Sequence, residues 1–324
     1  MHKQTTATAP GKVILIGEHA VVYNRPAIAV PVLGLEAKAV ITDMDRGTGC
    51  ILSAPQIQLY TPLADADTTE PLALVTRLTL EKLGITAIPD WRIEVTSELP
   101  VASGMGSGAA VSAALVRAIY THVGRNVDDA VDAETISALV YESERLHHGT
   151  PSGIDNTVIA YAKPVWFMRG QPPEVFTPSQ TLTIVIADSG TPSPTKETVG
   201  DVRRWWQASP QQYEGLFDEI GAIAQEARGL IEGRNPSTSQ QDMVEQLGVL
   251  FRQNQIILEQ IGVSSPLLEQ LITAACDAGA LGAKLSGGGR GGNIVALVRS
   301  EQIGDVRNAL LMAGAKRVVV TTVK

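Results

Sequence analysis

Three polar residues near the N-terminus have types and a spacing that suit chemistry on a small ligand. In PGKVILIGEHAVVY, Lys12 starts an apolar run, and Glu18 and His19 follow a glycine that interrupts it. A lysine at such a place is most often a solvated strand end. Glu18 and His19, however, lie between apolar runs, where burial is costly unless they have a partner or a role.

Two carboxylates in the stretch ESERLHHGTPSGIDN, residues 142–156, form a second candidate set. Glu144 falls in a predicted helix, where it can simply pair with Arg145 or with solvent. Asp155 follows a turn shaped by glycine and proline, and it either caps the next element or serves as a fixed base or metal ligand. The residues alone leave these alternatives open.

The stretch SELPVASGMGSGAA, residues 97–110, places glycines and serines between a predicted strand and a predicted helix. It matches the dinucleotide fingerprint at Gly104, Gly106 and Ala109. That fingerprint needs an acidic residue at the end of a second strand about 20 residues further on, and the polar segment GRNVDDAVDAET offers no such strand. Backbone N–H groups at a helix start suit a phosphate. We therefore predict a triphosphate site, although not one of the Walker A form, because no G-K-[ST] follows.

A second glycine run, SGGGRGGN over residues 286–293, precedes a predicted strand and not a helix. Taken alone it is as well explained by a flexible hairpin turn. Two glycine loops, one in each half of the chain, fit a ligand that is held between two domains.

Composition narrows the class of protein. The chain has 324 residues, a formal net charge of −8 and no block of lysine or arginine. This balance disfavours nucleic acid and acidic membrane surfaces as partners and favours small-molecule chemistry. Two cysteines are too few for a disulfide framework, and the N-terminus lacks the apolar core of a signal peptide. Because proline, glycine and charges break the apolar runs, we expect no transmembrane helix and a cytoplasmic location.

The elements that must position these residues form an α+β pattern with two domains. In the N-terminal half we expect strands over 56–63 and 91–99, and helices over 71–84, 108–124 and 132–149. Asp132 is the expected N-cap of the last of these helices. In the C-terminal half a strand over 181–190 precedes three helices between 195 and 262. The chain then reads helix, strand, glycine turn, strand, helix and strand.

Three of these stretches together resemble the GHMP kinase superfamily: PGKVILIGEHAVVY, LPVASGMGSGAAVS and KLSGGGRGGN. Within it, SERLHHGTPSGIDN and SPTKETVGDVR are similar to segments of the mevalonate kinases. The resemblance implies a ribosomal-protein-S5-like N-terminal ATP-binding domain over 1–180 and a ferredoxin-like C-terminal domain over 181–324. It also implies an active site in the cleft between the two domains.

The resemblance further implies transfer of the γ-phosphoryl group of ATP to the 5-hydroxyl of (R)-mevalonate, with Mg²⁺ as cofactor and a homodimer as the assembly. It makes Asp155 the base and Lys12 the cation that stabilises the transferring charge. The implied substrate contacts are Lys12, Glu18, His19, Asp155 and Thr195, and the implied metal ligands are Glu144 and Ser107. The implied phosphate-binding residues are Pro100, Ser103, Gly104, Met105, Gly106, Ser107, Gly108, Ala109, Gly288 and Gly289.

Two positions depart from the family pattern. The family commonly has a second serine in its phosphate loop that supplies a hydroxyl to Mg²⁺, but this chain has Gly108 there. We expect water and Glu144, or else Ser107, to complete the metal's ligands. Arg290 stands where the family usually has a glycine or a small residue, and it either adds a cation near the phosphates or points to solvent. Alternative functions are a phosphomevalonate-type kinase or a non-catalytic ligand sensor on the same fold.

Overall fold

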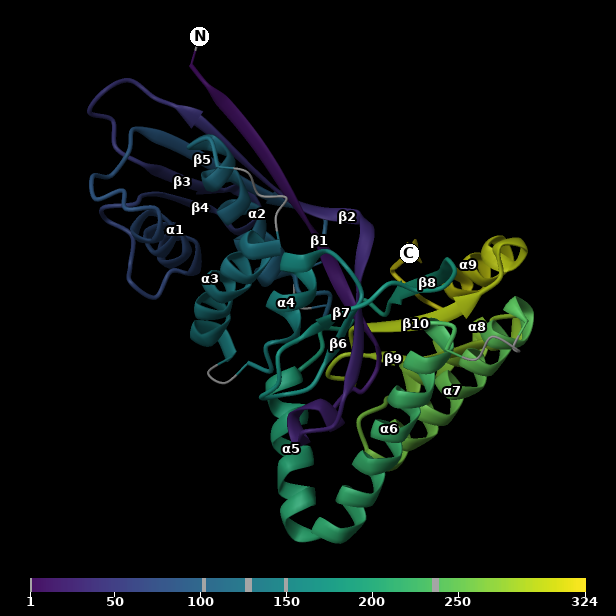
Figure 1. Cartoon of the computed structure of the whole chain (residues 1–324). Helices are drawn as coiled ribbons and strands as arrows, with labels where there is room; N and C mark the ends of the chain where they lie inside the picture. Colours follow the sequence, from purple (N-terminus) through teal and green to yellow (C-terminus); the bar gives the residue numbers. More distant parts are fainter. Residues whose placement is uncertain (1, 101–102, 126–129, 149–150, 235–238) are drawn as a thin grey trace. The chain divides into compact units, whose positions relative to one another are not determined.

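The structure is a computed structural model that describes all residues except 1, 101–102, 126–129, 149–150 and 235–238 (Figure 1). The chain divides into two compact units whose segments alternate along the sequence. The first unit comprises Met1–Gly11, Gly34–Pro100 and Gly106–Ala162; the second comprises Lys12–Leu33, Val101–Met105 and Lys163–Lys324. The strands β1 (Gln4–Ile16) and β2 (Ala27–Asp43) therefore each belong to both units. A single boundary near residue 180 stays a prediction.

The first unit combines a small sheet with a group of helices. From Ala37 to Asp43, β2 pairs antiparallel with β5 (Trp91–Ser97), and β5 pairs in parallel with β3 (Ile51–Ala54). The 3-10 helix η2 (Pro55–Ile57) turns the chain from β3 into its antiparallel neighbour β4 (Leu59–Pro62). The helices are α1 (Pro71–Lys82), α2 (Ser107–His122), α3 (Ala130–His148) and α4 (Ile154–Tyr161). Alanine-rich α2 contacts the other three helices and β5, because its small side chains allow close approach.

The second unit is built on a four-stranded antiparallel sheet in the order β11-β8-β10-β9. Its strands are β8 (Leu182–Asp188), β9 (Gly282–Ser286), β10 (Asn293–Val298) and β11 (Arg317–Val323). Helix α8 (Pro266–Asp277) precedes β9, and η3 (Ser300–Gln302) with α9 (Ile303–Met312) connects β10 to β11. This is the β-α-β-β-α-β arrangement of ferredoxin-like folds. The expected ferredoxin-like C-terminal fold is confirmed.

Three more helices, α5 (Thr195–Ala208), α6 (Pro210–Ile231) and α7 (Gln240–Ile261), lie between β8 and α8 in the sequence. Helix α7 packs directly on β9 (Figure 1). A Cβ added at Gly282 would lie 2.1 Å from the carbonyl oxygen of Gly248, so both positions need glycine. The two backbones are therefore close enough for side chains of α7 to reach the backbone of β9.

The remaining elements of the second unit are short. The 3-10 helix η1 (Ala20–Tyr23) follows β1 and contacts α6. The first residues of β2 pair with β6 (Val165–Phe167), and β6 pairs with β7 (Glu174–Val175). Among the helices that the structure describes, none is long and apolar enough to span a membrane.

The predicted helices and strands are confirmed with three differences. Strand β1 begins at Gln4, so Lys12 lies inside the strand and not at its start. Pro10 is tolerated there because β1 lies off the main path of its sheet, where it pairs with β2. Helix α3 begins at Ala130, so Asp132 is not its N-cap. The strand expected over 56–63 shrinks to Leu59–Pro62, because Pro55 opens a 3-10 turn.

Candidate functional site

Helix α2 in the first unit begins in a way that suits an anion. Its N-cap is Gly106, in the left-handed region with φ of 70°, and Ser107 is its first residue. No side chain caps this helix in the part of the chain that the structure describes, and its first turn carries no acidic residue. The first N–H groups of a helix lack partners within the helix and sit at its positive end. The residues from Gly106 to Ala109 can therefore present N–H groups to a phosphate.

A carboxylate lies beside this helix start. A Cβ added at Gly108 would stand 3.2 Å from Oε1 of Glu144, which is buried on α3. The Ser112 and Ser143 hydroxyls, 3.2 Å apart and buried, link α2 to α3 one residue before Glu144. A carboxylate oxygen and the Ser107 hydroxyl are hard donors of the kind that Mg²⁺ takes, and Mg²⁺ needs only one or two carboxylates besides phosphate oxygens. These residues thus fit the implied metal.

Asp155 lies in the first turn of α4, after Gly153 with φ of 90°. A negative side chain at this end of a helix is stabilised by the helix dipole. The next residue, Asn156, donates from its amide to the backbone oxygen and the hydroxyl of Ser137 on α3. Asp155 is therefore held on a helix that is anchored by a buried polar contact, and its own side chain is half-buried.

In the second unit, residues of the first glycine loop are hydrogen-bonded to β1 and to the end of the second glycine loop. The backbone N–H of Lys12 donates to the carbonyl of Met105 at 2.9 Å. The carbonyl of Ser103 accepts from the Asn293 side chain, which starts β10. The stretch from Ser103 to Met105 therefore contacts both β1 and the end of the second glycine loop. Lys12 is buried, and Pro100, which follows β5 in the first unit, is half-buried.

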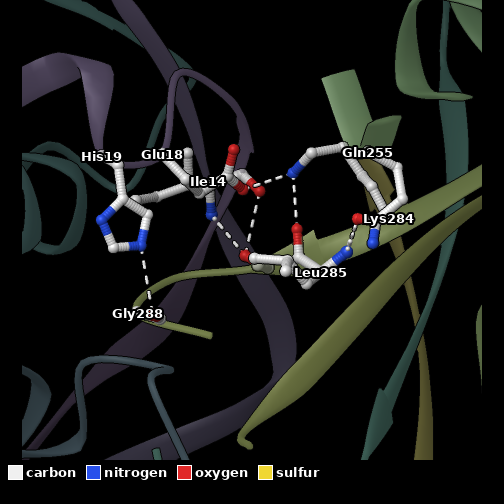
Figure 2. Close-up of polar contacts among 8 residues, drawn as sticks. Ile14, Glu18, His19, Gln255, Lys284, Leu285 and Gly288 are labelled. Atoms are coloured by element: carbon white, nitrogen blue, oxygen red, sulfur yellow. Dashed lines mark hydrogen bonds and ion pairs between the residues drawn. The ribbon is translucent and has the colours of Figure 1, made fainter. Parts of the chain in front are cut away.

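Glu18 forms a fully buried ion pair with Lys284 of β9 (Figure 2). Lys284 also donates to the carbonyl of Leu285 at 2.6 Å, and the N–H of Leu285 donates to the side chain of Gln255 on α7 at 2.9 Å. The Ser286 hydroxyl bonds to both the N–H and the carbonyl of Ile14 in β1, at 3.0 and 2.9 Å. These contacts lock the end of β1 to β9 immediately before the glycine loop.

Burial dominates the electrostatics of this pair. It raises the pKa of Glu18 above its usual value, while the charge and hydrogen bond of Lys284 oppose the shift. It lowers the pKa of Lys284, and Glu18 opposes that shift in turn. Each group therefore depends on the other for its charge, since neither has water to replace its partner.

The ring of His19 contacts the backbone of the second glycine loop. Its Nε2 lies 3.1 Å from the carbonyl of Gly288, so this nitrogen carries the proton and donates. Burial lowers the pKa of His19 to about 4, so the ring is neutral at pH 7. Its backbone has φ of 61°, an uncommon conformation for a residue with a side chain. His19 Nδ1 has no hydrogen-bond partner among the described residues.

The glycine loop touches the start of α5. A Cβ added at Gly288 would lie 2.6 Å from the Thr195 hydroxyl, and one at Gly289 would lie 2.0 Å from the carbonyl of Val263. Both positions therefore require glycine. Thr195 is an exposed residue, and its hydroxyl lies 3.3 Å from the Ser193 hydroxyl.

The structure thus groups the predicted residues by unit. In the first unit, Glu144 lies beside the start of α2. In the second unit, Lys12 lies on β1 and Thr195 is the first residue of α5. Glu18 and His19 lie between β1 and η1, Ser103, Gly104 and Met105 lie between β5 and α2, and Gly288 and Gly289 lie between β9 and β10. Sequence reasoning missed Lys284 and Gln255. A signal for Lys284 was available, because a buried acid such as Glu18 requires a cation and Lys284 stands in an otherwise apolar strand.

Two family models match the chain. The one described as GHMP kinases N terminal domain matches residues 72–163, and the one described as GHMP kinases C terminal matches residues 239–315. Together with a phosphate-suited helix start, they define a kinase of the GHMP class.

Relatives that match over most of their length narrow the class. Mevalonate kinase of Pyrococcus furiosus is 33% identical, covering 95% of this chain and 93% of that protein. Mevalonate kinase of Aeropyrum pernix is 30% identical, covering 94% and 91%. The crystal structure of L. major mevalonate kinase in complex with R-mevalonate has a TM-score of 0.81 at 27% identity, covering 100% of this chain and 97% of that one. The chain belongs to the mevalonate kinase family of the GHMP kinases, as the resemblance implied.

Proposed function

We propose that this kinase transfers the γ-phosphoryl group of ATP to the 5-hydroxyl of (R)-mevalonate, giving 5-phosphomevalonate and ADP on the mevalonate route to isoprenoids. The observation that carries the phosphoryl chemistry is the glycine-capped start of α2 with the Glu144 carboxylate beside Gly108. The relationship to mevalonate kinases over nearly the whole chain supports the choice of substrate.

The backbone carries most of the proposed phosphate binding. Helix N–H groups from Gly106 to Ala109 favour anionic oxygens, as do loop amides at Gly104, Gly288 and Gly289. Pro100, Ser103 and Met105 contribute by shaping the loop before α2. Side-chain cations are not needed in number, which fits the acidic overall charge of the chain.

Glu144 and the Ser107 hydroxyl are the proposed protein ligands of Mg²⁺. The ion, when bound, neutralises charge on the phosphate oxygens during transfer. Glu144 can serve because it is buried and held by α3 at the start of α2. Gly108 adds no hydroxyl, so water would have to supply the remaining ligands of a bound ion.

Asp155 is the proposed base that orients the attacking hydroxyl and receives its proton. Its place on an anchored helix keeps the carboxylate in one position. Phosphoryl transfer requires such a fixed geometry between the base and the attacking hydroxyl. Lys12 is the proposed cation that stabilises charge between nucleophile and phosphate.

For the substrate we propose a direct contact from Thr195, which is an exposed residue at the start of α5. Glu18 and His19 are buried and contact Lys284 and Gly288, so their proposed contribution is to support the loop beside Thr195. A direct contact between the His19 ring and the substrate stays a prediction.

An ADP-release assay across four alcohols tests this function. Purified protein with Mg²⁺ and ATP is incubated with mevalonate, phosphomevalonate, galactose or homoserine. We expect release only with mevalonate. Release with phosphomevalonate alone would assign the chain to that kinase activity, and ligand binding without release from any alcohol would identify a sensor.

A cytoplasmic location and a homodimer are also proposed. Sedimentation velocity of the purified chain measures the second directly. A single species at twice the chain mass of 34.3 kDa supports the dimer, and a species at the chain mass contradicts it.

A further inference from the structure

Arg290 interrupts a run of glycines over residues 287–292, and its backbone has φ of 59°. This left-handed conformation disfavours a residue with a Cβ, whereas glycine adopts it readily. Arginine at this position therefore has a conformational cost that glycine would not have. Contacts of the arginine side chain must offset that cost.

The side chain of Arg290 is bound to one face of helix α5. Its Nη1 donates to Oδ2 of Asp201 at 2.5 Å, and its guanidinium lies 5.5 Å from the centre of the Trp205 ring. Asp201 and Trp205 are four residues apart, so they lie on the same side of the helix. The hydrogen bond from Arg290 holds the pKa of Asp201 below its usual value, which keeps the acceptor ionised.

The rest of the loop is attached to the segment that leads into α5. The Ser193 hydroxyl donates to the carbonyl of Gly289 at 3.0 Å, and the N–H of Gly292 donates to the carbonyl of Thr191 at 2.7 Å. The N–H of Arg290 itself donates to the carbonyl of Val263 at 2.9 Å. The loop is therefore held by backbone and hydroxyl contacts at several points, while Arg290 is its one charged attachment among the described contacts.

We propose that Arg290 is a positioning residue whose guanidinium latches the glycine loop, residues 287–292, to α5 and so sets the amides of Gly288 and Gly289 for a phosphate. Asp201 takes up the positive charge of Arg290, so the side chain orders the loop and does not itself bind the phosphate. The latch stands on geometry alone, and its effect on phosphate binding rests on the proposed function.

Hydrogen–deuterium exchange of the ligand-free protein tests the latch without any activity. In R290Q and D201N we expect the amides of residues 287–292 to exchange about tenfold faster, as loss of a charge-assisted hydrogen bond predicts. The matched control is R204Q, because Arg204 pairs with the same Asp201 carboxylate on the exposed side of α5 and lies outside the loop. Exchange in R290Q at the wild-type rate would overturn the latch.

Steady-state kinetics then separates a latch from a direct phosphate contact. A latch predicts that R290Q and D201N each raise the KM for ATP by about three- to tenfold, and that the double variant is no worse than either. R204Q should keep the wild-type KM. A rise in R290Q together with a wild-type KM in D201N would assign Arg290 to the phosphate instead and refute the proposal.

Two further controls keep the tests distinct. R290K retains the charge but loses the planar fork and most of the stacking on Trp205, so it should restore part of the slow exchange. If the wild-type protein releases no ADP with mevalonate, the proposed function fails, while the exchange experiment still decides the latch. Thermal unfolding of each variant identifies any that has lost its fold.

Discussion

At Gly108, one oxygen of Glu144 limits the space for a larger side chain. A Cβ at this position would stand 3.2 Å from that oxygen, closer than ordinary packing. The family's serine would therefore add a hydroxyl and at the same time press on the carboxylate that we assign to Mg²⁺. The glycine leaves Glu144 undisturbed next to the helix start.

We expect Gly108→Ala to raise the Mg²⁺ concentration for half-maximal activity by about threefold, because its methyl group displaces Glu144. Gly108→Ser carries the same Cβ plus a hydroxyl, so it should need less Mg²⁺ than the alanine variant. Magnesium titrations of the initial rate measure both. Equal values for all three proteins would show that neither the contact nor the missing hydroxyl affects the metal.

Asp155→Asn removes the proposed base while keeping shape and the helix N-terminal position. We expect kcat to fall by about 10²- to 10⁴-fold, as loss of a positioned proton acceptor does, with the KM for ATP changed much less. Lys12→Met should lower kcat as well, because its role is in the transition state. Near-normal turnover in a folded Asp155→Asn protein would rule out the base assignment.

At the scale of elements, the end of β1 depends on β9 for the charge balance of Glu18. The pair of Glu18 with Lys284 is fully buried, and Ser286 and Gln255 add hydrogen bonds on the same short stretch. Removing one member of a buried ion pair leaves an uncompensated charge in the core. The ion pair and these hydrogen bonds therefore hold β1, β9 and α7 together next to the second glycine loop.

Lys284→Met should lower the free energy of unfolding by about 3–5 kcal/mol, because Glu18 is then buried without its cation. The double variant Glu18→Gln with Lys284→Met should recover much of that loss, since neither charge of the pair remains. Lys82→Met, at an exposed helix end, is the control and should change little. Urea unfolding followed by circular dichroism measures all three, and an unaffected Lys284→Met protein would contradict the buried pair.

At the scale of the whole molecule, the buried neutral His19 makes stability depend on pH. Its pKa is about 4 in the folded protein, against 6.5 for an ordinary histidine. Between these values the unfolded chain binds a proton that the folded chain does not. The contribution to stability is therefore complete above pH 6.5 and is lost as the pH falls towards 4.

Between pH 7 and pH 4 the wild-type protein should lose about 3 kcal/mol more unfolding free energy than His19→Asn, which cannot titrate there. Asparagine is a suitable replacement because it does not titrate and is found at positive φ more often than most residues. Urea unfolding at a series of pH values gives both curves. Parallel curves would mean that His19 has the same pKa in the folded and the unfolded protein.

Local pattern in the sequence was enough for much of this protein. The elements from α5 to β11 follow directly from apolar periodicity and glycine stops, because those signals act within one helix or strand. The sequence also allowed us to predict the family, the glycine-rich start of α2 and the carboxylates of Glu144 and Asp155. The extended start of β1 was not, because Pro10 and Gly11 read as breakers although an edge strand accepts them.

The tertiary structure decided which residues meet. Lys284 lies 266 positions from Glu18, and no periodicity links a buried acid to one particular lysine at that separation. In the same way, the sequence left Arg290 either near the phosphates or pointing to solvent, whereas in the structure its side chain binds Asp201 of α5. Sequence by itself determined most of the elements, the motifs and the family, since these depend on neighbouring residues. Burial, charge pairing and the role of each loop residue depend on packing between distant segments, which only the folded chain defines.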